Sequence, residues 1–296
     1  MLLLVLSITF FMMHLLPGGP FSEERKLPPQ IEQQLNQNYG LDQPIHIQYV
    51  TYLSHAVVGD FGPSYKYLSR SASQVITPAI GISLRVGFLA LLLGMGLGTV
   101  ITLLSAQNRI WLKSLSQQVA MLGLSTPYFV LGSLLVLCFA DGLGWFPSAR
   151  LTTPWHFVLP VFTMAINPAA YTILILTQSI ETTAQQKYIT IKNAFGISEK
   201  RVLHHHILRN ALLPLIAISG PMIANLLTGS FSVEVLFGIP GLGKYFVNAI
   251  FNRDYTVVMA ITMVYCLVLI IANIGVELLM VLVDPRLKQT SRYAAE

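Results

Sequence analysis

Charged residues are scarce in this 296-residue chain: they make up 10% of it, whereas 54% of the residues are hydrophobic. A soluble domain carries about 25% charged residues, so this shortage excludes an ordinary soluble protein and indicates an integral membrane protein. Only two cysteines occur, Cys138 and Cys266, both inside apolar runs, which argues against a disulfide framework. The net charge of +5 forms no basic stripe on a soluble domain, so nucleic acid is not an expected partner.

Long apolar runs predict an all-α membrane protein, since about 20 apolar residues cross a bilayer as one helix. Six transmembrane helices are predicted, at 1–16, 80–105, 119–140, 157–180, 211–233 and 256–283. The first run is short and lacks the basic region and cleavage site of a signal peptide. We therefore expect it to be a spanning helix whose N-terminal end is missing or shortened in this sequence.

The distribution of Lys and Arg predicts the orientation. These residues are denser in segments 106–118, 181–210 and 284–296 than in the alternating segments 17–79, 141–156 and 234–255. Because basic residues favour the cytoplasmic side, we expect the first set, and with it both termini, inside a cell inner (plasma) membrane. The alternating segments are then external loops. Four aspartates fall in these loops, where we expect solvent or a docked external protein to contact them: Asp42, Asp60, Asp141 and Asp254.

Small residues and prolines within the spans predict close packing and bending. Gly94 and Gly98 form a GxxxG pattern, which lets a neighbouring helix approach closely. Five prolines each free a backbone carbonyl and permit a kink: Pro127, Pro160, Pro168, Pro214 and Pro221. Together they favour a moving bundle of helices over a passive anchor.

A polar, basic stretch at 182–210 interrupts the apolar sequence near its C-terminal end. Glu181 to Phe195 contains good helix formers, and Gly196 suits the left-handed position that ends a helix. A second helix is predicted from Glu199 through Arg209 into the fifth span. The stretch is therefore a predicted helix-turn-helix on the cytoplasmic membrane surface.

One side of the first helix of this segment is apolar, formed by Tyr188, Ile191, Ala194 and Phe195. Such a face suits a groove on a partner protein. The alternative interpretation is an amphipathic helix that only lies on anionic lipid.

Several strings recur in order along nearly the whole chain and carry a family resemblance. They are LPGGPF at 16–21, YGLDQPIHIQYVTYL at 39–53, GDFGPSYKY at 59–67, LTGSFSVEVLFGIPGLG at 227–243, Arg253-Asp254-Tyr255 and Asp284-Pro285-Arg286. Gly196 and Leu213-Pro214 match fixed points of the cytoplasmic signature of ABC importer permeases, whose Glu-Ala-Ala is replaced here by Thr190, Ile191 and Lys192. The chain resembles the B-type permease subunit of the oligopeptide/dipeptide permease family.

This resemblance implies an ABC importer type I permease fold with an external region at 17–79, a permease core of five spans at 80–283 and a cytoplasmic tail at 284–296. Its implied function is to translocate oligopeptides by alternating access, as a transporter subunit and not an enzyme. The residues implied to couple it to the ATPases are Lys187, Tyr188, Ile191, Lys192, Ala194, Phe195, Gly196, Arg209 and Pro214.

The implied partners are a second homologous permease, two cytoplasmic ABC ATPase subunits, an external peptide-binding protein, the peptide substrate and membrane lipid. ATP and magnesium belong to the ATPase subunits, and no cofactor is expected on this chain. The string GIPGLGKY at 238–245 has P-loop spacing, but Tyr245 stands where a magnesium-binding Ser or Thr is required, and the string lies in a predicted external loop.

A few polar residues within the predicted spans are candidates for a gate or path: Arg85, Asn167, Asn273 and Glu277. Helix packing is the alternative interpretation of the two asparagines. His204, His205 and His206 do not predict a metal site, because consecutive helical residues point about 100° apart.

Other functions remain open at this point. The substrate of such a permease is alternatively a dipeptide, a nickel complex or an antimicrobial peptide. A different class, an ion-coupled secondary transporter, has Glu277 as its candidate ion site.

Overall fold

The computed structural model describes residues 2–15, 33–34, 36–37, 39–67, 69–106, 110–149, 151–195, 197–227 and 230–283. In these residues regular secondary structure is helical, apart from an isolated bridge between Pro63 and Ser71, which confirms the all-α prediction. The chain forms two compact units. The first comprises Met1–Ser83 and Ile239–Val268, and the second comprises Leu84–Gly238 and Leu269–Glu296.

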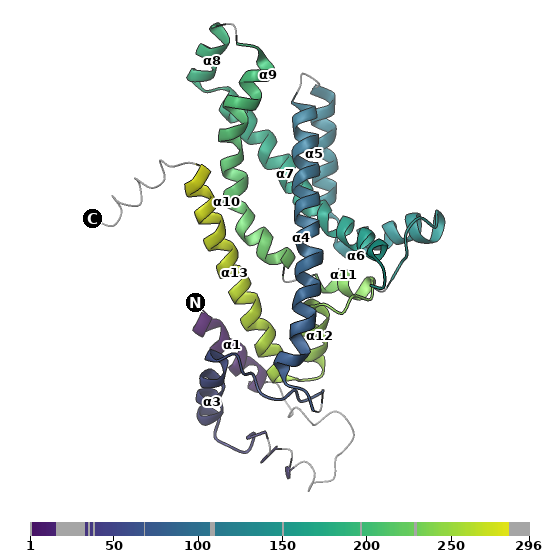
Figure 1. Cartoon of the computed structure of the whole chain (residues 1–296), viewed down its shortest axis with the longest axis vertical. Helices are drawn as coiled ribbons and strands as arrows, with labels where there is room; N and C mark the ends of the chain where they lie inside the picture. Colours follow the sequence, from purple (N-terminus) through teal and green to yellow (C-terminus); the bar gives the residue numbers. More distant parts are fainter. Residues whose placement is uncertain are drawn as a thin grey trace, which may run out of the picture. The chain divides into compact units, whose positions relative to one another are not determined.

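The first unit is built around the beginning of the last long helix. It contains α1 (Leu2–Leu15), α3 (Ile45–Val57), α12 (Leu242–Phe251) and the first turns of α4 (Ala72–Ser105) and α13 (Tyr255–Val283). Figure 1 shows α1 and α3 beside the first turns of α13. Phe10 and Met13 of α1 share one buried cluster with Val257 and Ile261 of α13. Burial of these apolar side chains holds the unit together.

Two helices of this unit lie in segments that hydropathy assigns to loops. α3 falls within 17–79 and α12 within 234–255. α12 is amphipathic, and its Leu242 and Ala249 are buried while Phe251 is exposed. These segments therefore contain helices that a hydropathy search for spans overlooks, while their placement outside the membrane stays a prediction.

α4 begins at Ala72, ahead of the predicted start at 80. Ser71 and Gln74 explain the earlier start: the Gln74 amide donates to Ser71 Oγ and the Ser71 amide donates to Gln74 Oε1, both at 3.2 Å. This reciprocal capping box satisfies two amides that would otherwise lack partners at a helix start. With 34 residues α4 is about 50 Å long, well beyond the ~30 Å of a bilayer core.

The second unit is a bundle with α7 at its centre. Its helices are α5 (Ile110–Ser125), α6 (Tyr128–Leu135), η1 (Val136–Gly142), η2 (Pro154–Phe157), α7 (Val158–Ala184), α8 (Lys187–Ala194), α9 (Glu199–Val202), η3 (Leu203–Ile207), α10 (Leu208–Leu227) and α11 (Phe231–Leu236). α7 contacts both α5 and α10, and Figure 1 shows it between them.

The GxxxG pattern lies where α4 meets α7. A Cβ atom at Gly94 would stand 2.5 Å from the Ala165 carbonyl oxygen, and one at Gly98 would stand 2.6 Å from that of Ala169. No side chain fits at these distances, so the two backbones touch directly. The predicted close approach of a neighbouring helix is confirmed, and α7 is that neighbour.

The third predicted span is not one continuous helix. Residues Trp111–Ser125 and Tyr128–Gly142 form two apolar helices that meet at an angle of 107°. Pro127 supplies no backbone N–H and disfavours the helical conformation at Thr126. The Leu122 carbonyl accepts from both the Thr126 amide at 3.1 Å and the Thr126 hydroxyl at 2.7 Å, so the first helix is closed just before the bend. The prediction of one helix over 119–140 was therefore wrong, whereas the bend predicted at Pro127 is present.

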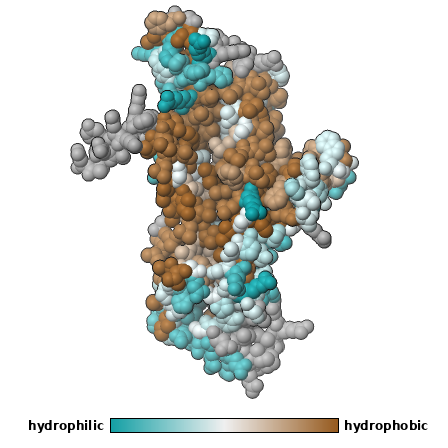
Figure 2. Space-filling model, viewed as in Figure 1, coloured by the Kyte–Doolittle hydropathy of each residue, from teal (hydrophilic) through white to brown (hydrophobic). Residues whose placement is uncertain are grey.

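Among the described residues, four helices are long and apolar enough to cross a membrane, or five if the bent pair is one span. α1 is a shorter apolar helix. These helices are consistent with the six predicted spans, although the count itself stays a prediction. Figure 2 shows hydrophobic residues over the long helices of the second unit and hydrophilic residues gathered over α8 and α9. This distribution is the one expected for a membrane bundle with a polar end.

Candidate functional site

The polar end of the second unit begins where α7 stops. The Gln185 amide donates to the Glu181 carbonyl and the Gln186 amide to that of Thr183, which closes α7 and turns the chain. α8 is therefore a separate helix that begins at Lys187. The prediction of one helix from Glu181 to Phe195 was wrong, because this turn interrupts it. The second predicted helix is confirmed, since α9, η3 and α10 follow one another from Glu199 through Arg209.

One side of α8 is fastened to the bundle by apolar packing. Ile189 is 2% exposed and belongs to a cluster with Leu176 and Ile180 of α7 and Val202 and Ile207 of the following helices. α8 thus contacts the end of α7 and the beginning of the helix that leads into α10. The buried contact therefore ties α8 to both of these long helices.

Three polar contacts reinforce the packing. Asn210 Nδ2 donates to the Tyr188 hydroxyl at 2.7 Å, and that hydroxyl donates to the His206 carbonyl at 3.5 Å. Lys192 Nζ donates to His206 Nδ1 at 2.7 Å. Because an ammonium group only donates, His206 accepts with an unprotonated Nδ1. His206 belongs to η3, a π-helical turn that contains the three consecutive histidines.

The opposite side of α8 carries the exposed Ile191, at 56%, and the residue directly after the helix, Phe195, is 81% exposed. Tyr188, predicted on the same face, instead packs toward the bundle. The Ala194 side chain and all of Gly196 lie outside the described residues, so the turn predicted at Gly196 is untested. The site therefore separates into an anchored inner side and an apolar outer side.

The remaining residues of the predicted coupling site are spread around it. Lys187, Arg209 and Pro214 are exposed, and Lys192 is half-buried beside His206. Near the site, Lys113 of α5 forms an ion pair with Glu181 at the end of α7. No group of three metal-ligating side chains occurs in the part of the chain that the structure describes.

The four polar residues predicted for a gate or path have different surroundings. Arg85 and Glu277 are exposed on α4 and α13. The Asn167 Oδ1 is buried and has no hydrogen-bond partner among the described residues, and the Asn273 side-chain oxygen lies against Gly220 of α10. The Asn273 contact is of the helix-packing kind, and a gate or path role for the four residues stays a prediction.

Sequence reasoning missed the burial of Asp254 in the first unit. This carboxylate is 1% exposed and accepts hydrogen bonds from the Ser64 hydroxyl, the Tyr65 amide at 3.2 Å and the Lys66 amide at 3.3 Å. It also accepts from the Val257 amide at 3.3 Å, in the first turn of α13. The prediction that solvent explains Asp254 was wrong. An aspartate just before a long apolar run signals a helix cap, but nothing nearby in the sequence reveals the other partners.

The Asp254 carboxylate affects the tyrosine beside it. Burial is the main cause that raises the pKa of Tyr65 above the usual value of 10.0, and the negative charge of this carboxylate is the second. Tyr65 therefore keeps its phenolic proton at physiological pH.

Comparison with protein families gives two matches that together cover most of the chain. Residues 90–289 match a family model described as "Binding-protein-dependent transport system inner membrane component". Residues 1–86 match the corresponding N-terminal model, "Binding-prot-dependent transport system membrane comp, N-term". The chain belongs to this family. It is accordingly an integral inner-membrane permease subunit of an ABC importer.

Curated relatives of this permease are similar over nearly their full length. It is 38% identical to the dipeptide transport system permease protein DppB of Bacillus subtilis, with 97% of this chain and 94% of the relative aligned. Identity is 35% to the oligopeptide transport system permease protein OppB of Haemophilus influenzae and 34% to that of Escherichia coli, each with 97% of this chain and 95% of the relative aligned.

A solved structure supports the fold of the permease. It is described as an amino acid ABC transporter with histidines, and it is 19% identical to this chain. The two structures superpose over 70% of this chain and 92% of the other, with a TM-score of 0.56. At this identity the likeness shows the fold alone, and it agrees with the predicted importer fold. Family membership favours the importer over the ion-coupled secondary transporter considered from the sequence.

Proposed function

We propose that this permease moves peptides through the inner membrane in an ATP-driven importer. The observation that carries the proposal is its identity of 34–38%, over 97% of the chain, to dipeptide and oligopeptide permease proteins. The proposed partners are a second homologous permease, two cytoplasmic ATPases and an external peptide-binding protein. The ATPases bind and hydrolyse ATP with magnesium, while this chain supplies the path and has no ATPase activity of its own.

In this proposal α8 is the element through which the ATPases act. Its outer side presents Ile191 and Phe195 to an apolar groove on an ATPase, as in helix-in-groove recognition. Its inner side, through Ile189 and Tyr188, transmits the movement of that groove to α7 and α10. The two long helices then open and close the path by alternating access.

The proposed orientation follows from the position of this docking side. Residues 182–210 and both termini lie in the cytoplasm, while 17–79 and 234–255 lie outside, where they meet the binding protein. Arg85, exposed on α4, is proposed to act on the gate and not on peptide choice. Because the spans carry few charges, peptide contacts are expected to be directed mainly at the peptide backbone or to pass through water.

Reconstitution tests this function directly. The full assembly is placed in liposomes, and uptake of radiolabelled dipeptides, tripeptides and pentapeptides is measured with and without internal ATP. The proposal predicts uptake that requires both ATP and the external binding protein, and the preferred length assigns a dipeptide or oligopeptide substrate. Uptake driven by an ion gradient without ATP would overturn it, as would ATP-dependent uptake of nickel alone.

The docking role of α8 is tested by replacing two exposed phenylalanines, one at a time, by serine. Phe195→Ser should abolish co-purification of the ATPases, while Phe251→Ser, at a similarly exposed position on α12, should leave it unchanged. Equal effects of the two variants would contradict the docking role.

A further inference from the structure

A cavity of about 400 Å³ lies within the first unit, between α1, α3 and the first turns of α13. Its volume falls within the ~300–1,000 Å³ that is usual for small-molecule sites. Six aromatic rings line it: Phe10, Tyr39, Tyr52, Phe61, Tyr65 and Tyr255. Neither Lys nor Arg occurs among the lining residues of this cavity. The rings and the absence of these basic side chains favour a cationic ligand over an anionic one.

The wall of the cavity is held in place by hydrogen bonds. Gln48 Nε2 donates to the carbonyls of Leu41 at 3.2 Å and Gln43 at 2.7 Å, while its Oε1 lies 3.2 Å from His14 Nε2. These bonds join α1, α3 and the segment that precedes α3. The rings of Tyr65 and Tyr255 stand edge to face, with centroids 5.9 Å apart. A site fixed in this way loses little freedom when a ligand binds.

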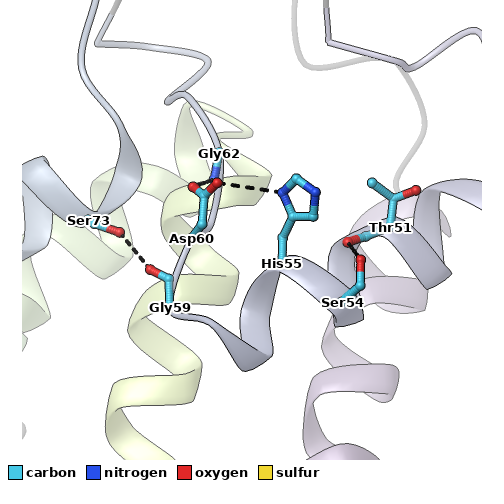
Figure 3. A network of polar contacts seen from close by, with 7 residues as sticks. All are labelled: Thr51, Ser54, His55, Gly59, Asp60, Gly62 and Ser73. Carbon is cyan, nitrogen blue, oxygen red and sulfur yellow. Dashed lines mark hydrogen bonds and ion pairs between the residues drawn. The ribbon is translucent and has the colours of Figure 1, made fainter.

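A carboxylate, Asp60, is among the lining residues of the cavity, and Figure 3 shows it turned toward His55. Its Oδ1 accepts from the Gly62 amide at 3.0 Å, and its Oδ2 lies 3.6 Å from His55 Nδ1. Gly59 and Gly62 have φ angles of 76° and 77°, which favour glycine, and the Gly59 carbonyl accepts from the Ser73 hydroxyl at 3.1 Å. The turn therefore holds a negative charge beside the cavity, and the Asp60 side chain stays 58% exposed to incoming solutes.

A tyrosine hydroxyl on the wall lacks a hydrogen-bond partner. The Tyr52 hydroxyl is buried and has no hydrogen-bond partner among the described residues. A buried polar atom without a partner is uncommon and is explained by a water molecule or a ligand that completes it.

We propose that this cavity binds the α-ammonium end of a peptide. The ammonium group lies at the aromatic faces, and Asp60 supplies the opposite charge. Every unmodified linear peptide carries this group, so its recognition tolerates any sequence. The inference rests on the proposed peptide import and adds an external site on the permease itself.

Binding to the assembled transporter tests the site. The complex in lipid nanodiscs, without the external binding protein, is titrated calorimetrically with trialanine and with N-acetyl-trialanine. Acetylation removes the charge and should weaken binding about tenfold or more, the equivalent of one charge-assisted contact. Asp60→Asn should weaken trialanine binding to a similar extent, whereas Asp42→Asn, an exposed carboxylate outside the lining, should leave it unchanged.

A second pair of variants tests the aromatic wall without altering the charge. Tyr39→Phe keeps the ring and should bind trialanine as wild type does, while Tyr39→Leu removes it and should weaken binding. Equal affinity for the two peptides overturns the inference, and so does amine-dependent binding that Asp60→Asn leaves intact. If ATP-dependent peptide uptake persists in either case, the proposed function stands; if the wild-type assembly takes up no peptide, the proposed function fails.

Discussion

The buried carboxylate of Asp254 accepts a hydrogen bond from the Ser64 hydroxyl, although the two residues are 190 positions apart in the chain. Asp254 directly precedes α13, and Ser64 begins the stretch whose next two amides, of Tyr65 and Lys66, also donate to this carboxylate. A single side chain thus caps the last long helix and fastens the early segment to it. Both partners belong to the first unit, and Tyr65 and Tyr255 beside them line the cavity described above.

Removal of the Asp254 carboxylate should destabilise the first unit. Asp254→Ala leaves the Ser64 hydroxyl and several amides without their acceptor and should cost roughly 3 kcal/mol, more than a helix cap alone. Thermal unfolding of the purified chain in detergent measures the loss. Asp42→Ala, at an exposed aspartate, should leave the midpoint unchanged, and a matching drop in that control would contradict the role of Asp254.

Glycine-to-alanine substitutions in α4 should show whether contact with α7 or helix propensity decides the change in stability. Gly94→Ala and Gly98→Ala place a Cβ against the carbonyls of Ala165 and Ala169 and should destabilise the second unit by about 1–3 kcal/mol. Gly96→Ala meets nothing within 4 Å and should stabilise α4 by about 0.5–1 kcal/mol. Denaturant unfolding of the three variants gives the comparison. The same sign of change at all three positions would show that backbone contact does not decide the effect.

Ile189 and Ile191 lie two positions apart on α8 and should behave differently. Ile189→Ala opens a cavity in the buried cluster and should loosen α8, with a local cost of about 2–4 kcal/mol. Ile191→Ala removes an exposed side chain and should leave the helix intact while weakening ATPase attachment. Hydrogen–deuterium exchange over 187–194 reports the first effect and co-purification the second. Faster exchange in Ile191→Ala would contradict this division.

The Tyr188 hydroxyl should matter for coupling more than for assembly. Tyr188→Phe removes the group that joins Asn210 and the His206 carbonyl and should cost about 1 kcal/mol. The ATPases should still bind, because Ile191 and Phe195 remain, but each transported peptide should require more ATP. The ratio of ATP hydrolysed to peptide imported measures this change. Tyr171→Phe, at an exposed tyrosine of α7, serves as the control, and an unchanged ratio in both would exclude a coupling role.

The helical class and most of the spans could be predicted because hydropathy is a local property. Twenty apolar residues must form a helix in lipid wherever they lie, so α13 coincides almost entirely with its prediction at 256–283. The GxxxG pattern and the order of short motifs likewise depend on nearby residues. The bend at Pro127 was predicted for the same reason, but not its size, because the packing around a proline determines how far the chain turns.

The sequence by itself determined that the chain is an all-helical membrane protein, since composition and periodicity suffice for that. It also carried the family resemblance. Only the tertiary structure decided that Asp254 is buried, that Tyr188 faces inward while Phe195 faces out, and that aromatic rings from α1, α3 and α13 enclose one cavity. The physical reason is that burial and hydrogen bonding join residues far apart in the chain. No local pattern records which distant group will satisfy a carboxylate or cover one side of a short helix.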